Sequence, residues 1–409
     1  MSLPPLLPCF AATAIGLESL ARDELTALGL LPSEIEPGGV PFTTDAAGLA
    51  TALLQLRTVA RVTVRIGTFQ ARSFAELERH AAKVDWSSVI PRGSAVHFRV
   101  TSKKSRLYHQ DAIAERLERS VLATVTGASA VRAASAAEER EADVTRLPEM
   151  QRIIVRLHRD QVTLSADASG ALLHRRGWRQ AVAKAPLRET LAAAMLQGIG
   201  WDGSVPFHDP FGGSGTIAIE AAQRARRMAP GRGRRFAAEG WPALPPSLFA
   251  MARHAATAAE LPAAAVIISA SDRDHGAVRA MQENAERAGV ADDLTIDRAT
   301  VTMLPPDDGA GWIVTNPPYG VRIGDGPDLR DLYATLGNVM RSRRPGWRLA
   351  LLSADPRLTG QLEMRLTPVW RSENGGLPVE LAVDEREKER KREGEKESPR
   401  PEHSEGPRH

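Results

Sequence analysis

Residues that can position a reacting amine follow a short apolar strand predicted at 312–314. The segment after that strand contains Asn316, Pro317, Pro318 and Tyr319. Two consecutive prolines remove backbone donors and fix the chain, so that carbonyl oxygens and the Asn316 amide oxygen can point into one cleft. An exocyclic amine can donate both of its protons to such acceptors, which helps turn its lone pair toward an electrophile. Tyr319 would stack on the base that carries the amine, with a contribution of about 1 to 3 kcal/mol. The alternative is a proline turn beside a core tyrosine.

A glycine-rich turn lies between a predicted strand at 205–208 and a predicted helix at 217–228. Its residues are Asp209, Pro210, Phe211, Gly212, Gly213, Ser214, Gly215 and Thr216. Glycine lets the backbone approach a ligand closely. The turn lacks the Gly-Lys-Ser/Thr ending of a triphosphate site and the third-glycine spacing of a pyrophosphate site. It therefore favours a ligand without phosphates, and Asp209 could meet a cationic amino group of that ligand.

An acidic residue follows the next predicted strand, at 266–270. This acid is Asp272, and Arg273 and Asp274 come directly after it. Open α/β sheets bind ribose hydroxyls at the carboxyl end of their second strand, so we expect Asp272 to bind a ribose. We expect Asp274 to cap the helix predicted at 276–288. The glycine turn and Asp272 are farther apart than the roughly 20 residues of a compact dinucleotide unit, because residues 229–262 form an insertion.

The elements that position these segments predict a doubly wound α/β sheet. Its apolar strands alternate with helical segments, which is typical of a parallel sheet. The strands are predicted at 205–208, 266–270, 313–315 and 349–353, and a helix at 186–196 precedes them. Two further strands, at 363–371 and 377–383, are joined by Asn374-Gly375-Gly376 as a hairpin.

The first half of the chain predicts an α+β fold that ends near Asp167. The predicted helices extend from Phe10 to near Gly29 and cover 48–55, 73–83 and 110–122. The predicted strands cover 40–43, 61–68, 95–101, 153–157 and 162–165. Residues 384–409 are almost wholly Glu, Lys, Arg, Pro and Ser, so we expect a disordered tail there.

The composition of the 409 residues excludes several classes of protein. A hydrophobic content of 43% with 25% charged residues is that of a soluble globular protein, and no apolar run approaches the roughly 20 residues of a membrane span. The single cysteine, Cys9, excludes a disulfide framework, a thiolate zinc site and an iron–sulfur cluster, and we predict no metal site. The N-terminus does not have the features of a secretory signal, so we expect a cytoplasmic protein. A net charge of +3 permits a polyanionic partner.

The three motifs resemble those of a known enzyme family. Residues 209–216 look like motif I, Asp272 like the motif II acid, and Asn316 to Tyr319 like the N/D-P-P-Y motif IV of class I S-adenosylmethionine methyltransferases acting on amino nitrogens. That motif IV also occurs in DNA adenine methylases and in glutamine methyltransferases of release factors. The rest of the chain narrows the choice, because it resembles bacterial 23S ribosomal RNA guanine-N2 methyltransferases with their ferredoxin-like and THUMP regions. The matching segments are 10–18, 38–42, 56–61, 84–86, 169–170, 173–179, 185–190, 229–231, 235–236 and 239–241.

The resemblance implies both a domain order and a reaction. It implies a ferredoxin-like segment at 1–44, a THUMP RNA-binding region at 45–166 and a Rossmann-like, seven-stranded class I methyltransferase domain at 167–384, before a tail at 385–409. The implied reaction transfers a methyl group from S-adenosyl-L-methionine to N2 of a guanine in 23S rRNA, with the guanine flipped out of its stack. The implied catalytic residues are Asn316, Pro317, Pro318 and Tyr319. The implied cofactor residues are those of the glycine turn together with Asp272, Arg273, Thr300, Ala185, Pro186 and Leu187.

The sequence departs from the family pattern at Thr300 and Gly212, and the place of its single cysteine agrees with the family's chemistry. Thr300 stands where the family usually has an acid near the adenine amino group, with Asp297 three positions earlier. Gly212 stands where relatives often have cysteine. Carbon-5 methylation of a pyrimidine needs a cysteine nucleophile, and Cys9 lies in the half of the chain without the site, which agrees with transfer to an amine.

Basic residues supply the candidates for RNA contact. These are Lys103, Lys104, Arg106, Arg175, Arg176 and Arg179, and each could instead lie on a solvated face. A denser arginine cluster at 224–235 allows phosphate binding or a solvated helix end. A tRNA guanine-N2 methyltransferase, a DNA adenine methylase and a non-catalytic RNA-binding ribosome assembly factor remain as alternatives. The sequence does not identify the target guanine or the oligomeric state. It also does not show whether the substrate is naked RNA or a particle.

Overall fold

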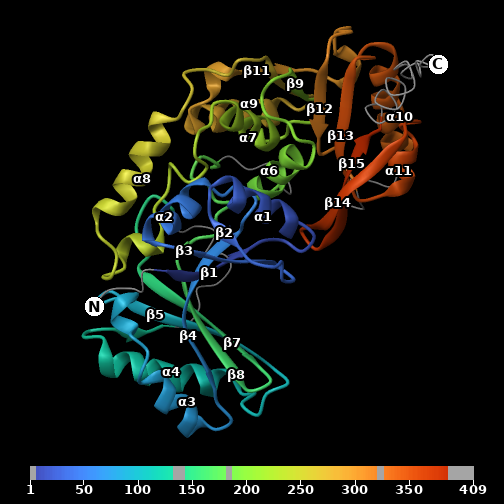
Figure 1. Cartoon of the computed structure of the whole chain (residues 1–409). Helices are drawn as coiled ribbons and strands as arrows, with labels where there is room; N and C mark the ends of the chain where they lie inside the picture. Colours follow the sequence, from blue (N-terminus) through green and yellow to red (C-terminus); the bar gives the residue numbers. More distant parts are fainter. Residues whose placement is uncertain (1–5, 132–142, 181–186, 320–326, 386–409) are drawn as a thin grey trace, which may run out of the picture.

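Two β-sheets with helices packed on them make up the protein (Figure 1). The computed structural model describes residues 6–131, 143–180, 187–319 and 327–385. Residues 386–409 of the predicted tail lie outside these ranges. No helix within them is long and apolar enough to cross a membrane.

The first sheet has eight strands, in the order β2-β3-β1-β4-β8-β7-β5-β6. Their bounds are β1 (Leu7–Ala12), β2 (Leu31–Pro32), β3 (Gly39–Thr44), β4 (Arg61–Gln70), β5 (Ala95–Lys103), β6 (Ser129–Ala130), β7 (Met150–His158) and β8 (Gln161–Asp167). Neighbours are antiparallel, except that β5 runs parallel to β6 and β7. Because β4 pairs with β1 on one side and β8 on the other, the predicted ferredoxin-like and THUMP segments share one sheet.

Among the described residues of this half, the α-helices are α1 (Glu18–Ala27), α2 (Ala46–Gln55), α3 (Phe74–Ala81) and α4 (Gln110–Thr124). Asp45 and Ser73 cap α2 and α3, since each side chain accepts a backbone N–H of the first turn. The helix predicted from Phe10 begins only at Glu18, so that prediction was wrong at its start. Phe10 lies in β1, where the alternating burial of Leu7, Cys9 and Ala11 is the pattern of a strand.

The second sheet has seven strands, in the order β11-β10-β9-β12-β13-β15-β14. Their bounds are β9 (Phe207–Asp209), β10 (Ile268–Asp272), β11 (Leu294–Arg298), β12 (Gly311–Thr315), β13 (Trp347–Ser353), β14 (Leu366–Asn374) and β15 (Leu377–Asp384). The first five in this order are parallel, whereas β15 is antiparallel to both of its neighbours. The predicted fold class, an α+β half followed by a doubly wound, seven-stranded α/β sheet, is confirmed. The predicted hairpin is β14 and β15.

Helices cover both faces of the second sheet. They are α6 (Glu189–Gly198), α7 (Thr216–Ala225), α9 (His275–Ala288), α10 (Pro327–Ser342) and α11 (Pro356–Gly360), whereas α8 (Ser247–Ala258) packs in the core of the first sheet. Val314 of β12 packs in the core cluster that contains α6, α7 and α9, and its neighbour Ile313 packs in the cluster that contains α10. Because successive strand residues point to opposite faces, these clusters are the two sides of one sheet.

The insertion at 229–262 joins the two halves. Its Phe236, Trp241 and Phe249 are buried in the core of the first sheet, and Trp241 Nε1 donates a hydrogen bond to Gln151 Oε1 of β7 at 2.8 Å. Helix α8 lies beside α2 (Figure 1). The sequence did not indicate a role for this segment, and the fold makes it a brace between the second sheet and the first sheet.

Candidate active site

The predicted site segments meet at the carboxyl ends of three parallel strands. β9 lies between β10 and β12, and the chain continues from β9 to β10 on one side while β12 lies on the other. Open α/β sheets bind ligands in the crevice where the strand order reverses in this way. Asp209 and Asp272 end β9 and β10, and Asn316 follows β12, so the fold brings all three to one edge.

The glycine turn after β9 leaves open space at one of its glycines. Gly213 and Gly215 have φ angles of +53° and +86°, which favour glycine. A Cβ at Gly215 would lie 2.6 Å from Met281 Cγ, and a Cβ at Gly212 would lie 2.5 Å from Met281 Cε. These two glycines therefore let the turn pack on α9. A Cβ at Gly213 would meet nothing within 4 Å, so the backbone of Gly213 borders the open space of the crevice.

The Asp272 carboxylate fixes the turn. Its Oδ2 accepts the backbone N–H of Gly213 at 3.0 Å, and its Oδ1 accepts the N–H of Asp274 at 2.9 Å. Asp274 caps α9 as predicted, because its Oδ1 accepts the N–H of Ala277 at 2.8 Å. An ionised carboxylate has about four lone-pair sites, so the half-buried Asp272 keeps acceptors for ligand hydroxyls.

Asp209 is a buried acid, and both of its hydrogen bonds are made by one carboxylate oxygen, Oδ1. Its Oδ1 accepts the backbone N–H of Phe211 at 3.1 Å and the hydroxyl of Thr315 at 2.6 Å. Burial raises the pKa of Asp209 to about 7, although these two hydrogen bonds act in the opposite direction. A cationic group placed in the crevice would favour the ionised carboxylate. The sequence did not indicate the role of Thr315.

The segment after β12 presents an unused acceptor. Asn316 Oδ1 is buried and has no hydrogen-bond partner among the described residues. Pro317 is buried beside it, and the carbonyl of Pro318 accepts the hydroxyl of Tyr333 at 3.4 Å. A buried acceptor without a partner costs about 1 to 3 kcal/mol. The arrangement therefore favours a ligand that brings a donor to Asn316.

Tyr319 is half-buried and held by its hydroxyl. The side-chain amide of Asn374, at the end of β14, donates to the Tyr319 hydroxyl at 2.9 Å. The ring packs against the apolar clusters on both sides of the sheet, and burial raises the pKa of the hydroxyl. The sequence predicted only a turn around Asn374, so this contact was not foreseen.

Arg179 braces the glycine turn from outside the crevice. Its Nη2 donates to Thr216 Oγ1 at 2.6 Å and to the carbonyl of Leu187 at 2.7 Å, and its Nε lies 3.2 Å from Glu189 Oε1. The buried amide of Asn284 adds a second brace, since its Nδ2 donates to the carbonyl of Ser214 at 3.0 Å. We therefore correct Arg179 from a candidate RNA contact to a residue that positions the start of α7.

Arg176 is also internal. Its side chain is 2% exposed, its Nε donates to Glu220 Oε1 of α7 at 3.2 Å, and its Nη2 donates to the carbonyl of Arg57 at 2.6 Å. Burial leaves this guanidinium no access to a phosphate, so it too is corrected to an ion-pair partner between the two halves. Arg175 is half-buried in the same segment. The signal for this pairing was Glu220 itself, a lone acid within the apolar run 217–222.

Arginines of the denser cluster at 224–235 contact other residues of the protein, among them Arg226 and Arg234. Arg234 donates to the carbonyls of Leu172 and Arg175 through Nη1 and to those of Ser169 and Ala171 through Nη2. Burial lowers the pKa of Arg234 to about 9. Arg226 pairs with Asp293 at 3.1 Å. The Arg234 guanidinium therefore holds the segment 169–175 that follows β8, whereas Arg226 pairs within the second half.

The remaining predicted site residues differ in burial and position, and two of them lie outside the described residues. Leu187 is buried, Arg273 and Thr300 are exposed, and Thr300 Oγ1 is 2.8 Å from Thr302 Oγ1. Ala185 and Pro186 lie outside the described residues. Lys103, Lys104 and Arg106 are exposed at the far end of β5, in the first sheet. No group of three or more potential metal ligands occurs in the described ranges.

Family models match both halves of the chain. The RMKL-like methyltransferase domain matches residues 176–382, and the RlmL ferredoxin-like domain matches residues 8–63. A protein of Synechocystis sp. named for an expected RNA methyltransferase activity, slr0064, is 31% identical over 375 residues, which are 91% of this chain and 95% of the relative.

Two solved structures share the whole architecture. SMU.472, named as a candidate methyltransferase and crystallised with SAH, is 28% identical with a TM-score of 0.80, over 93% of this chain and 98% of that chain. A Listeria monocytogenes protein, named as a predicted N6-adenine-specific DNA methylase, is 29% identical with a TM-score of 0.79, over 93% and 96% of the two chains. The matched domains, their order and the site geometry agree, and the chain belongs to the RlmL-like family of class I methyltransferases.

Proposed function

We propose that this protein is an RNA methyltransferase that acts on N2 of a guanine in 23S rRNA. The methyl donor is S-adenosyl-L-methionine, in agreement with the SAH in the SMU.472 structure. RNA as the substrate is supported by the name of the Synechocystis relative. Guanine N2 and 23S rRNA are supported by the resemblance of the N-terminal segments, and with them we propose that residues 45–166 are a THUMP RNA-binding region.

The residues at the ends of β9 and β10 fit the cofactor. S-adenosyl-L-methionine supplies an electrophilic methyl group on a sulfonium sulfur, and it carries an ammonium and a ribose but no phosphate. The open space at Gly213 accepts a ligand, Asp272 keeps acceptors for ribose hydroxyls, and the ionised form of Asp209 suits a cation. We propose that Leu187, Arg273 and Thr300 line the same site.

The proposal depends on one observation, the buried Oδ1 of Asn316, which has no hydrogen-bond partner in the part of the chain that the structure describes. In our account this oxygen and the Pro317 carbonyl accept the two protons of the guanine amino group, which directs the nitrogen lone pair toward the methyl group. The Tyr319 ring stacks on the flipped base. Because Asn374 holds the Tyr319 hydroxyl, the ring is placed before the base arrives.

One alternative activity has a specific observation in its favour. The Listeria neighbour is named as an adenine-specific DNA methylase, and the acceptor at Asn316 and the ring of Tyr319 suit the amino group of adenine as well as that of guanine. A tRNA guanine-N2 methyltransferase would use the same residues. An assembly factor without catalysis would need no ligand at Asp209 and Asp272.

Modified nucleosides from cells with and without the gene separate these functions. Loss of N2-methylguanosine from 23S rRNA alone supports the proposal. Its loss from tRNA, or loss of N6-methyladenine from DNA, would identify the corresponding alternative. Unchanged nucleosides, together with no S-adenosyl-L-methionine binding by calorimetry, would favour the assembly factor.

A further inference from the structure

The hairpin of β14 and β15 carries the residue that holds the Tyr319 ring. Asn374, the last residue of β14, donates its side-chain amide to the Tyr319 hydroxyl at 2.9 Å. Strand β14 is the last strand in the order of the second sheet. An edge strand leaves one row of its backbone groups unpaired within the sheet, so contacts from outside the sheet help to fix where the end of β14 lies.

Contacts with α6 and with the first half of the chain hold β14, and they lie in order along the strand. Trp370 Nε1 donates to a backbone carbonyl of α6 at 3.2 Å. The next two residues, Arg371 and Ser372, lie against Gly16, which belongs to the loop between β1 and α1. Asn374 follows two residues later, so Gly16 supports the strand closer to Asn374 than Trp370 does.

The approach of Gly16 to β14 leaves no room for a side chain. A Cβ at Gly16 would collide with the carbonyl oxygen of Arg371 and would lie 2.9 Å from its carbonyl carbon. Both are backbone atoms, so the strand itself would have to move. Gly16 also has a φ angle of +91°, which favours glycine. Glycine is therefore needed here both for the turn and for the place of the hairpin.

The loop that carries Gly16 is fixed to the first half by one carboxylate. Glu18 Oε2 accepts the backbone N–H of Gly16 at 2.7 Å, and Glu18 Oε1 accepts that of Gly38, between β2 and β3, at 2.9 Å. The backbone N–H of Thr13 donates to the carbonyl of Gly38 at 3.0 Å. These bonds hold both ends of the loop against the first sheet.

Helix α1 and the residue before it dock on the second half (Figure 1). Leu17 is 1% exposed and packs in the core of the second sheet, in the cluster that contains Trp370. The side-chain amide of Gln197 in α6 donates to the carbonyl of Leu20 at 2.8 Å. The loop at Gly16 therefore keeps one place relative to both sheets.

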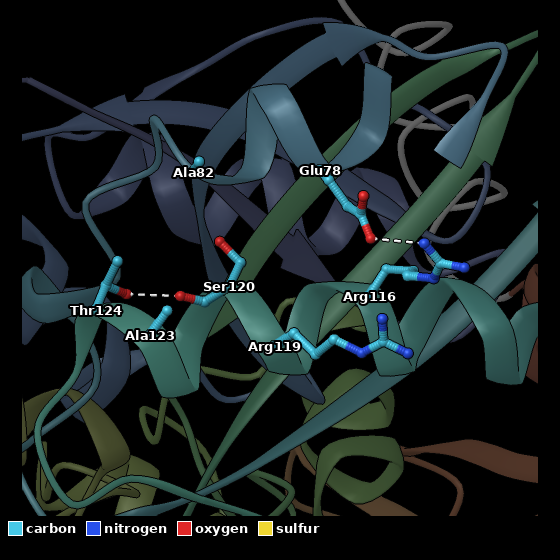
Figure 2. Close-up of a pocket in the computed structure, with 7 residues that line it drawn as sticks. All are labelled: Glu78, Ala82, Arg116, Arg119, Ser120, Ala123 and Thr124. Atoms are coloured by element: carbon cyan, nitrogen blue, oxygen red, sulfur yellow. Dashed lines mark hydrogen bonds and ion pairs between the residues drawn. The ribbon is translucent and has the colours of Figure 1, made fainter. Parts of the chain in front are cut away.

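Helices α3 and α4 lie at the other end of the first sheet, away from the hairpin (Figure 1). In the groove between them, Arg116 pairs with Glu78 at 2.7 Å (Figure 2). Arg119 lines the same groove and pairs with Glu115 at 2.7 Å. A substitution in this groove changes the first half without touching the contact with β14, so the groove supplies a control.

We propose that Gly16 is a positioning residue for Tyr319. Gly16 fixes β14, and Asn374 at the end of that strand holds the ring. The inference rests on the proposed function, in which this ring stacks on the target base. It gives the ferredoxin-like segment a part in the methyl-transfer site that needs no contact with RNA, because Gly16 acts through the hairpin.

Fluorine NMR of the full-length protein with ring-fluorinated tyrosine tests this directly. The chain has three tyrosines, and replacing each by phenylalanine assigns the three resonances. Gly16→Ala should move the Tyr319 resonance toward the position that it takes in Asn374→Ala. The matched control is Gly29→Ala, since Gly29 also has a positive φ angle, +71°, but a Cβ there would meet nothing within 4 Å. This control and Arg119→Gln should leave the Tyr319 resonance at its wild-type position.

Steady-state kinetics measure the consequence for the reaction. Gly16→Ala should raise the KM for RNA about 2- to 10-fold, the scale of one lost hydrogen bond. It should add nothing in a Tyr319→Ala background, where the ring that it acts on is absent. Tyr319→Phe leaves the hairpin in place, so it should not reproduce this loss.

A second variant keeps the test decisive if Gly16→Ala does not fold. Glu18→Gln weakens the hold on the loop without adding a Cβ, and it should also move the Tyr319 resonance. Unchanged S-adenosyl-L-methionine binding by calorimetry shows that a variant is folded, since the glycine turn does not touch the loop at Gly16.

An unmoved Tyr319 resonance in the folded variant, or an equal displacement in Gly29→Ala, would overturn the inference. An equal rise in KM with and without the Tyr319 ring would also overturn it. The NMR measurement needs no RNA, so a displaced ring in a protein that methylates no guanine would remove only the proposed function. Methylation of rRNA together with an unmoved resonance would remove only this inference.

Discussion

Replacing Asp209 by Asn should stabilise the cofactor-free protein at neutral pH. Both hydrogen bonds to the carboxylate end on Oδ1, and the Oδ1 of asparagine can accept both. The variant therefore removes a buried charge and keeps its contacts. Burial raises the pKa of Asp209 from 3.8 to about 7, a shift of about three units that corresponds to about 4 kcal/mol in the free energy of unfolding.

The sign of this effect follows from the raised pKa. Below about pH 4 the carboxyl group is protonated in both the folded and the unfolded chain, so no penalty arises. The penalty grows as pH rises, because the unfolded chain ionises while the folded protein stays protonated, and it is complete once pH passes the folded-state pKa of about 7. Between pH 5 and pH 8 the wild type should lose about 3 kcal/mol relative to Asp209→Asn.

Urea unfolding followed by tryptophan fluorescence at pH 5, 6.5 and 8 measures this difference. The Asn variant should be the more stable protein at pH 8, with a smaller margin at pH 5. The same variant should bind S-adenosyl-L-methionine about 10- to 100-fold more weakly at pH 8, since a hydrogen bond to a charged group contributes about 1.5 to 3 kcal/mol. A stability difference that does not change with pH, or a less stable Asn variant at pH 8, would refute the reasoning about the buried charge.

Two further predictions concern the glycine turn and the stacking ring. Arg179→Ala should weaken S-adenosyl-L-methionine binding about tenfold in calorimetry, the scale of one charge-assisted hydrogen bond, because Thr216 and the Leu187 carbonyl lose their shared donor; Arg179→Lys should recover part of the affinity, and equal losses would argue against the brace. Tyr319→Ala should raise the KM for RNA about 5- to 100-fold, the scale of base stacking, whereas Tyr319→Phe keeps the ring and should stay close to wild type in steady-state kinetics. Equal effects of the two changes would assign the role to the hydroxyl.

The features that could be predicted from the sequence are those set by local backbone preferences. The glycine turn after β9, the acid at the end of β10, the Asp274 cap and the hairpin at Gly375 all lie where expected. Each depends on residues within a few positions of one another, so spacing alone identifies it. The glycine turn and the acid at the end of β10 lie at the same edge of the sheet, as expected from the rule that parallel strands run in one direction.

The features that could not be predicted depend on contacts distant in sequence. The arginines after Leu173 have the composition of a solvated segment, and their acidic partners lie on α6 and α7, up to 44 residues away. The insertion carries its own apolar residues, but nothing in its pattern shows that Trp241 packs on β7. Burial of a charged side chain requires a partner. The lone acid Glu220 within the apolar run 217–222 indicates that it has one, but nothing local shows that the partner is Arg176.

The most direct test of the account is the rate of a single turnover of methyl transfer to RNA by Asn316→Ala. The reaction is run with saturating RNA and S-adenosyl-L-methionine, and calorimetry checks that cofactor affinity is unchanged. Asn316→Asp keeps an acceptor oxygen and serves as the matched control. Loss of one aligning hydrogen bond in a buried site typically lowers the rate by about 100- to 1,000-fold. We predict such a loss for the Ala variant and a smaller one for the Asp variant. A wild-type rate in Asn316→Ala would contradict the account.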